Sequence, residues 1–107
     1  MVKLPDNIEK VLYDYIGKLS KEIHIISAIL FGSYARGNWR NDSDVDVAVF
    51  SDSFSNMDRT QAIAFLLDKA LHYGIDIQPL AFDEKDFRND NENPFITEIM
   101  TTGIKIA

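Results

Sequence analysis

Two short apolar runs separated by turn residues constrain what this chain can fold into. Residues 23–31 are rich in β-branched and aromatic side chains and end at Gly32-Ser33, and residues 45–50 form a second run of the same kind. Runs of this length, bounded by glycine, serine and aspartate, are typical of buried strands. We therefore expect a core built around a β-sheet.

Helices are expected before and between the strands. Residues 4–19 place apolar side chains at three- and four-residue spacings, which predicts an amphipathic helix. Asn56 or Asp58 can cap a second helix that runs toward Gly74, since glycine is the usual residue at a helix C-terminus.

The last third of the chain is expected to hold a strand, a loop, a helix and a final strand. Residues 75–82 predict a third strand, in which Pro79 indicates a sheet edge or a strand end. The polar run of residues 83–93 is expected to form a loop or a frayed turn. Residues 93–103 predict a short helix opened by Asn-Pro and ended by glycine, before a strand over residues 104–106.

These elements predict an α+β (α/β-like) fold, with a mixed sheet of three or four strands and helices packed mainly on one face. The 107 residues are expected to form a single domain, residues 1–107, that buries an adequate core without disulfides. Because the chain has no cysteine, a disulfide framework, a zinc knuckle and a thiol nucleophile are excluded.

The charge balance argues against nucleic acid as a partner. The formal net charge is -6, residues 41–107 hold 13 acidic and five basic side chains, and no basic patch stands out. Affinity for a phosphate backbone depends on clustered Lys and Arg. The longest apolar stretch, residues 25–31, is too short to cross a bilayer, and the N-terminus lacks the apolar segment of a signal peptide. We therefore expect a cytoplasmic protein without a membrane partner.

The residues that carry chemistry gather between the first two strands. Gly32 and Ser33 follow the first strand, and Asp44 and Asp46 begin the second. Side chains two apart on a strand point to the same face, so the two carboxylates project together. Glycine lets the backbone approach an anion, serine adds a hydroxyl donor, and carboxylates bind divalent cations. This segment predicts a site for a divalent cation and a phosphate.

Other phosphate and cation motifs do not fit. No Gly-Lys-Ser/Thr follows a glycine loop, and the glycine spacing is not that of a dinucleotide-binding turn. An EF-hand loop beginning at Asp42 would put Val47 where glycine belongs and Ser53 where the bidentate glutamate belongs.

The segment instead resembles the signature of the minimal nucleotidyltransferase (MNT) family of the DNA polymerase beta superfamily. That signature is Gly-Ser, ten intervening residues and Asp-x-Asp, as in Gly32-Ser33 and Asp44-Val45-Asp46, and Ala35-Arg36-Gly37 and Ser43 also match. The resemblance spans nearly the whole chain. It implies transfer of a nucleoside monophosphate from a nucleoside triphosphate to an acceptor hydroxyl, with pyrophosphate leaving.

The resemblance also implies the role of each site residue. The family places a third carboxylate on a strand that follows a helix, and Asp76 is the matching residue here. Asp44, Asp46 and Asp76 would be catalytic and would hold two Mg²⁺ ions, and Asp76 would help to remove the acceptor proton. The residues that would bind the phosphates of ATP are Gly32, Ser33 and Arg36.

Short members of the family are often encoded beside a small helical HEPN ribonuclease and act as its antitoxin. Some of these MntA-like antitoxins, of the type VII kind, modify a tyrosine of the toxin with AMP. The resemblance therefore implies an Mg²⁺-dependent protein adenylyltransferase acting on a HEPN-family toxin, in a possible hetero-oligomer with it. The alternative is a catalytically silent antitoxin that masks a partner ribonuclease by binding. The intact Gly-Ser and three carboxylates favour the enzyme.

Three side-chain roles stay open at this level. Ser33 could cap the segment after the turn rather than contact phosphate. Arg36 could pair with a surface acid. Tyr34 and Trp39 could stack on a base or pack against the strands.

Overall fold

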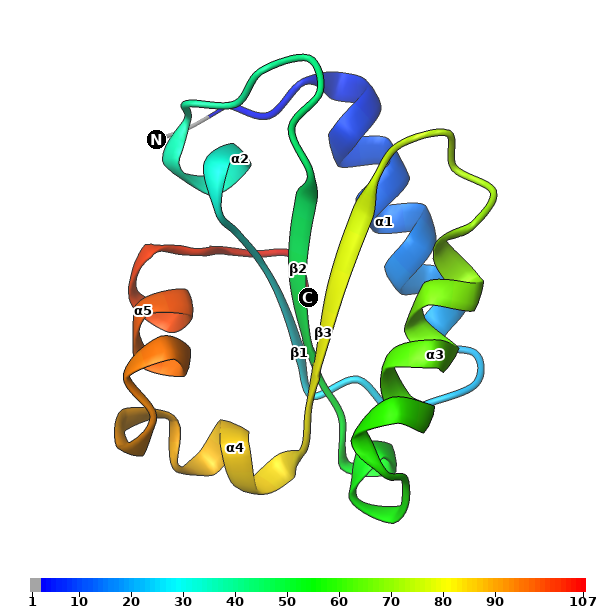
Figure 1. Cartoon of the computed structure of the whole chain (residues 1–107), viewed down its shortest axis with the longest axis vertical. Helices are drawn as coiled ribbons and strands as arrows, with labels where there is room; N and C mark the ends of the chain where they lie inside the picture. The colour runs from blue at the N-terminus through cyan, green and yellow to red at the C-terminus, as the bar shows by residue number, and fades with distance from the viewer. Residues whose placement is uncertain (1–2) are drawn as a thin grey trace.

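The structure is a computed structural model that describes residues 3–107, and a four-stranded mixed sheet runs through its centre (Figure 1). In chain order the elements are α1 (Asp6–Leu19), β1 (Ser27–Phe31), α2 (Ser33–Arg36), β2 (Val45–Phe50), the 3₁₀ turn η1 (Asp52–Asn56), α3 (Arg59–Ala70), β3 (Ile77–Phe82), α4 (Glu84–Arg88), the 3₁₀ turn η2 (Asp90–Glu92), α5 (Pro94–Thr102) and β4 (Ile104–Lys105). The strand order is β3-β2-β1-β4. β1 is antiparallel to β2 and β4, whereas β2 and β3 are parallel.

The sheet separates two apolar layers. The two longest helices, α1 and α3, cover one face, and α4 and α5 lie on the other side (Figure 1). Alternate residues of β2 serve the two layers: Val47 packs with the larger cluster under α1 and α3, and Ala48 packs with the smaller cluster that includes Ile96 of α5. The Tyr15 hydroxyl ties α1 to α3 by donating to the Leu66 carbonyl oxygen at 2.7 Å. The expected α+β class is confirmed.

Most predicted elements are present, some with shifted ends. The second strand has the predicted bounds, and Asp58 caps α3 in a capping box with Gln61. The first strand begins later than predicted, at Ser27, because the chain leaving α1 first makes a tight turn in which the Ile23 amide donates to the Leu19 carbonyl. Across the part of the chain that the structure describes, no helix is long and apolar enough to span a membrane.

Residues 83–93, predicted as a loop or a frayed turn, contain more regular structure than expected. This segment forms α4 and η2. Asp83 and Asp86 cap α4 reciprocally, each carboxylate accepting the other residue's backbone N–H at 3.0 Å. Phe87 anchors the helix, with its ring edge-to-face on Phe50 at a centroid distance of 5.5 Å. The polar composition of residues 83–93 therefore gave no indication of a helix that packs against the sheet through the Phe87 ring.

Pro79 lies on an edge strand, as predicted. The Val45 amide donates to the Asp76 carbonyl and the Ser51 amide donates to the Phe82 carbonyl, so even-numbered residues of this strand turn their backbone groups toward β2. Pro79 is odd-numbered, and its nitrogen therefore faces the free edge, where no ladder hydrogen bond is lost.

Two glycines allow a matched test of packing at the β4 edge. A β-carbon on Gly103 would overlap the Ile29 side chain and the carbonyl oxygens of Ile99 and Leu30, whereas one on Gly17, inside α1, would meet nothing. We expect Gly103→Ala to lower the free energy of unfolding by about 1–3 kcal/mol. Gly17→Ala should raise it by about 0.5–1 kcal/mol. Urea denaturation measures both, and equal effects of the two substitutions would contradict the close packing at Gly103.

Candidate active site

Parallel pairing of β2 and β3 brings the predicted carboxylates to one end of the sheet. In the register, Val45 lies opposite Ile77 and Asp46 lies opposite Gln78, and the Val45 amide donates to the Asp76 carbonyl at 2.8 Å. Asp44 and Asp76, one residue earlier on each strand, therefore face each other. This end of the sheet lies beside α2 (Figure 1).

The carboxyl groups of Asp44 and Asp76 are in close contact, and that of Asp46 lies near them. A close contact with the Asp76 carboxyl group, and then the charge of that group, raises the pKa of Asp44 above its ordinary value; partial burial and Asp42 act in the same direction. Burial, and then the charge of Asp44, raises the pKa of Asp46, while Arg36 opposes this. A cation at this position would relieve the repulsion.

The turn after β1 lies against the same carboxylates. Phe31, the last residue of β1, pairs with Asp46, and Gly32 then turns the chain with a φ of 76°. A β-carbon on Gly32 would overlap Oδ2 of Asp46. Glycine is therefore required twice, by the backbone conformation and by the close approach of Asp46.

Ser33 and Arg36 are the first and last residues of α2. The N-cap of this short helix is Gly32, with no capping side chain, so the structure does not use Ser33 as a cap. Arg36 is exposed and is near enough to Asp46 to oppose the rise in its pKa. Both predicted nucleotide-binding side chains thus lie on the turn that contacts Asp46.

The aromatic residues of this segment pack on each other. Tyr34 is buried, and its ring stacks on Trp39 with centroids 5.3 Å apart and planes 12° from parallel. Of the two roles left open, packing is the one that this geometry favours for Tyr34.

Sequence reasoning missed two contacts of the site. Besides the approach of Gly32 to Asp46, the Gln78 side chain donates from Nε2 to Oδ1 of Asp76 at 2.6 Å. Strand alternation predicts that Gln78 shares the face of Asp76, but it does not predict the hydrogen bond between them.

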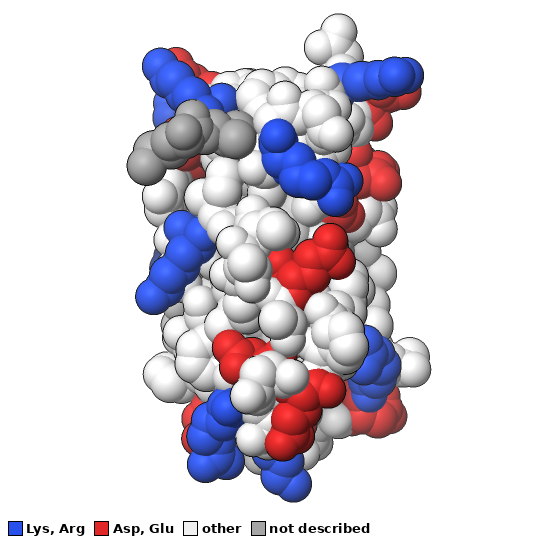
Figure 2. Space-filling model, turned by 90° about the vertical axis from the view of Figure 1, so that its left-hand side faces the viewer, with Lys and Arg blue, Asp and Glu red and all other residues white. Residues whose placement is uncertain are grey.

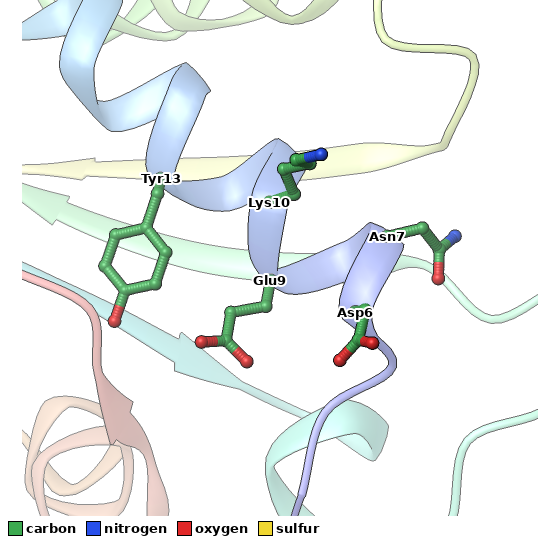
Figure 3. Close-up of a pocket in the computed structure, with 5 residues that line it drawn as sticks. All are labelled: Asp6, Asn7, Glu9, Lys10 and Tyr13. Carbon is green, nitrogen blue, oxygen red and sulfur yellow. The ribbon is translucent and has the colours of Figure 1, made fainter.

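Two hollows differ in what surrounds them. One of about 330 Å³ is bordered by Asp76, Ser43 and Arg40, but Asp44 and Asp46 do not line it. Another of about 620 Å³ lies on the exposed side of α1, where neighbouring turns of one helix supply all the lining side chains (Figure 3).

On the face that α5 covers, Lys and Arg are spread out rather than gathered into one patch (Figure 2).

The donor set fits magnesium that is shared with a substrate. Carboxylate oxygens are ligands that Mg²⁺ prefers. Within residues 3–107, no three Asp, Glu or His side chains converge closely enough to enclose a metal ion by themselves. Mg²⁺ is commonly held by one or two carboxylates together with substrate phosphates and water, so Asp44 and Asp46 suit such an ion.

The sequence is similar to known nucleotidyltransferases. Residues 14–107 match the family described as "Polymerase beta, Nucleotidyltransferase". A candidate protein adenylyltransferase of Methanocaldococcus jannaschii is 34% identical over 104 residues, covering 92% of this chain and 70% of that protein. A second one from the same organism is 28% identical over 99 residues, covering 91% and 95%.

Two solved structures share the fold. One is a candidate nucleotidyltransferase from Sulfolobus solfataricus, with a TM-score of 0.67, 14% identity, and coverage of 98% of this chain and 89% of that one. The other, described as a toxin-antitoxin with AMP-PNP, has a TM-score of 0.56 and 22% identity, and the match covers 89% of this chain and 72% of that one.

Gly32 and Gly74 allow a matched test of the turn. Both have positive φ, at 76° and 70°, but only a β-carbon on Gly32 would meet Asp46; at Gly74 the space is open. We expect Gly32→Ala to lower the free energy of unfolding by more than the backbone strain of about 1–2 kcal/mol, because Asp46 must also move. Gly74→Ala should cost only that backbone strain. Urea denaturation measures both, and equal losses of stability would contradict the contact.

Proposed function

This chain belongs to the polymerase beta nucleotidyltransferase family, and from its site we propose that it transfers AMP from ATP to a hydroxyl group of a partner protein. One observation carries the proposal. Asp44 and Asp76 are in close contact at the end of the sheet where Gly32 approaches Asp46. Phosphate-binding and carboxylate groups thus lie side by side, as nucleotidyl transfer requires.

The strand order gives the reaction a direction. Ser33 follows β1, Asp46 lies on the neighbouring β2, and Asp76 precedes the outer strand β3. With the β- and γ-phosphates near Ser33 and Arg36, the α-phosphate falls beside Asp44 and Asp46. The pyrophosphate then leaves on the β1 side of the site. An in-line acceptor approaches from the β3 side, next to Asp76.

The transfer balances with these residues. The acceptor oxygen forms a bond to the α-phosphorus while the bond from that phosphorus to the β-phosphate oxygen breaks. The acceptor proton passes to the Asp76 carboxylate, and the negative charge leaves with pyrophosphate, where Arg36 and the Ser33 hydroxyl stabilise it.

Magnesium is part of the proposal, with Asp44, Asp46 and Asp76 as the residues that would hold two ions. When bound, the metal withdraws charge from the phosphoryl oxygens and lowers the pKa of the acceptor hydroxyl. The support is the carboxylate donor set and the raised pKa values of Asp44 and Asp46, which a nearby cation would offset.

The proposed acceptor is a tyrosine of a HEPN-family toxin, which makes this chain an antitoxin. Support comes from relatives named as candidate protein adenylyltransferases and from a structural neighbour described as a toxin-antitoxin. The HEPN and tyrosine assignments themselves follow from the resemblance of the Gly32–Asp46 segment to the MNT signature.

A labelling experiment tests the proposal. The protein is incubated with Mg²⁺, ATP labelled at the α-phosphate and a purified HEPN-family toxin. We expect label on a toxin tyrosine, and a loss of at least about 10²-fold in Asp44→Asn and Asp46→Asn. Asp68→Asn, which changes an exposed acid of α3, should transfer normally.

The outcomes separate the enzyme from a silent antitoxin. Absence of label on any toxin residue, together with full toxin neutralisation by Asp44→Asn, would contradict the enzyme and support masking by binding alone. Loss of both labelling and neutralisation in Asp44→Asn supports the proposed activity.

A further inference from the structure

The carboxylate of Asp76 is held by one neighbouring side chain. Gln78 lies two residues further along β3 on the same face, and its Nε2 donates to Oδ1 of Asp76 at 2.6 Å. The Asp44 carboxyl group is the other side chain in close contact with this carboxylate. Gln78 is exposed, so burial of an apolar surface does not explain its position.

The surroundings of Gln78 explain why an amide suits this place. Its register partner on β2 is Asp46, and Asp76 in turn contacts Asp44. An amide N–H bonded to an ionised carboxylate makes a short, strong hydrogen bond. A lysine here would add a positive charge that competes with a bound cation, whereas glutamine orients the carboxylate and leaves the charge of the cluster unchanged.

We propose that Gln78 is a positioning residue for nucleotidyl transfer, which fixes the orientation of the Asp76 carboxylate through its hydrogen bond to Oδ1. The proposal rests on the proposed function. Asp76 is exposed just before the outer strand, so without this bond its carboxylate would have more orientations available to it. Only a fraction of these would meet an in-line acceptor.

This role separates the effect on turnover from the effect on nucleotide binding. Gln78 lies on β3, two strands away from the Gly32-Ser33 turn that would hold the phosphates. Loss of its amide should therefore lower kcat and leave KM for ATP unchanged.

The test uses two variants of similar length. Gln78→Met removes the donor and should lower kcat about 10-fold with KM for ATP within about twofold. Gln78→Glu replaces the donor with a carboxylate facing Asp46 and Asp76 and should lower kcat further. Gln61→Met is the control: its side-chain oxygen accepts the Asp58 amide in the α3 cap, so this change should lower stability and spare kcat.

Two further measurements show whether Gln78 acts through Asp76. In the Asp76→Ala background, Gln78→Met should cause no additional loss of rate. In the free protein, the side-chain amide ¹⁵N–¹H resonances of Gln78 should shift on Asp76→Ala, a readout that needs neither ATP nor metal.

The results of these experiments distinguish the positioning role of Gln78 from the proposed function. Additive losses in the double variant, a raised KM with unchanged kcat, or unshifted amide resonances would overturn the positioning role. If the wild-type protein transfers AMP and Gln78→Met transfers it equally fast, the positioning role is wrong and the proposed function stands. If the wild-type protein transfers no AMP, the proposed function is wrong as well.

Discussion

The parallel pairing of β2 with β3 is the constraint on which the site depends. It places Asp44 opposite Asp76, and strand alternation adds Asp46 on the same face. The helix α3 makes this pairing possible, because parallel neighbours require a crossover connection. The contact with Asp76 and the charge of its carboxyl group, which raise the pKa of Asp44, are therefore direct products of the topology. Neighbouring carboxylates at this position suit a cation bound together with a triphosphate.

The surrounding contacts keep the carboxylates in place without cancelling their charge. Gly32 lets the β1 turn approach Asp46, Arg36 faces the same carboxylate from α2, and Gln78 donates an uncharged hydrogen bond to Asp76. Within residues 3–107, none of the three aspartates forms a salt bridge within 4.0 Å. Stability is supplied elsewhere, by the two apolar layers and by contacts such as that between Tyr15 and the Leu66 carbonyl.

Local sequence patterns predicted much of the fold and the residues of the site. They failed for features that depend on contacts between residues far apart in the sequence. β2, the Asp58 cap and the edge position of Pro79 follow from composition and spacing. α4 was missed because its stability comes from Phe87 meeting Phe50, a contact between distant parts of the chain. Periodicity predicts strands but not which strands pair with each other. The contact between Asp44 and Asp76, and the overlap with Asp46 that a β-carbon at position 32 would cause, therefore could not be predicted.

The most direct test of the clustered carboxylates is the melting temperature of wild type and Asp44→Asn in EDTA, from neutral pH down to about pH 4. Because the pKa of Asp44 is raised above 3.8, its charge destabilises the folded state at neutral pH, and this cost disappears as the group is protonated. We expect Asp44→Asn to melt higher than wild type at neutral pH, with a difference that shrinks as the pH falls. An Asp44→Asn protein that melts lower than wild type at neutral pH, or by the same margin at every pH, would contradict the repulsion on which the site depends.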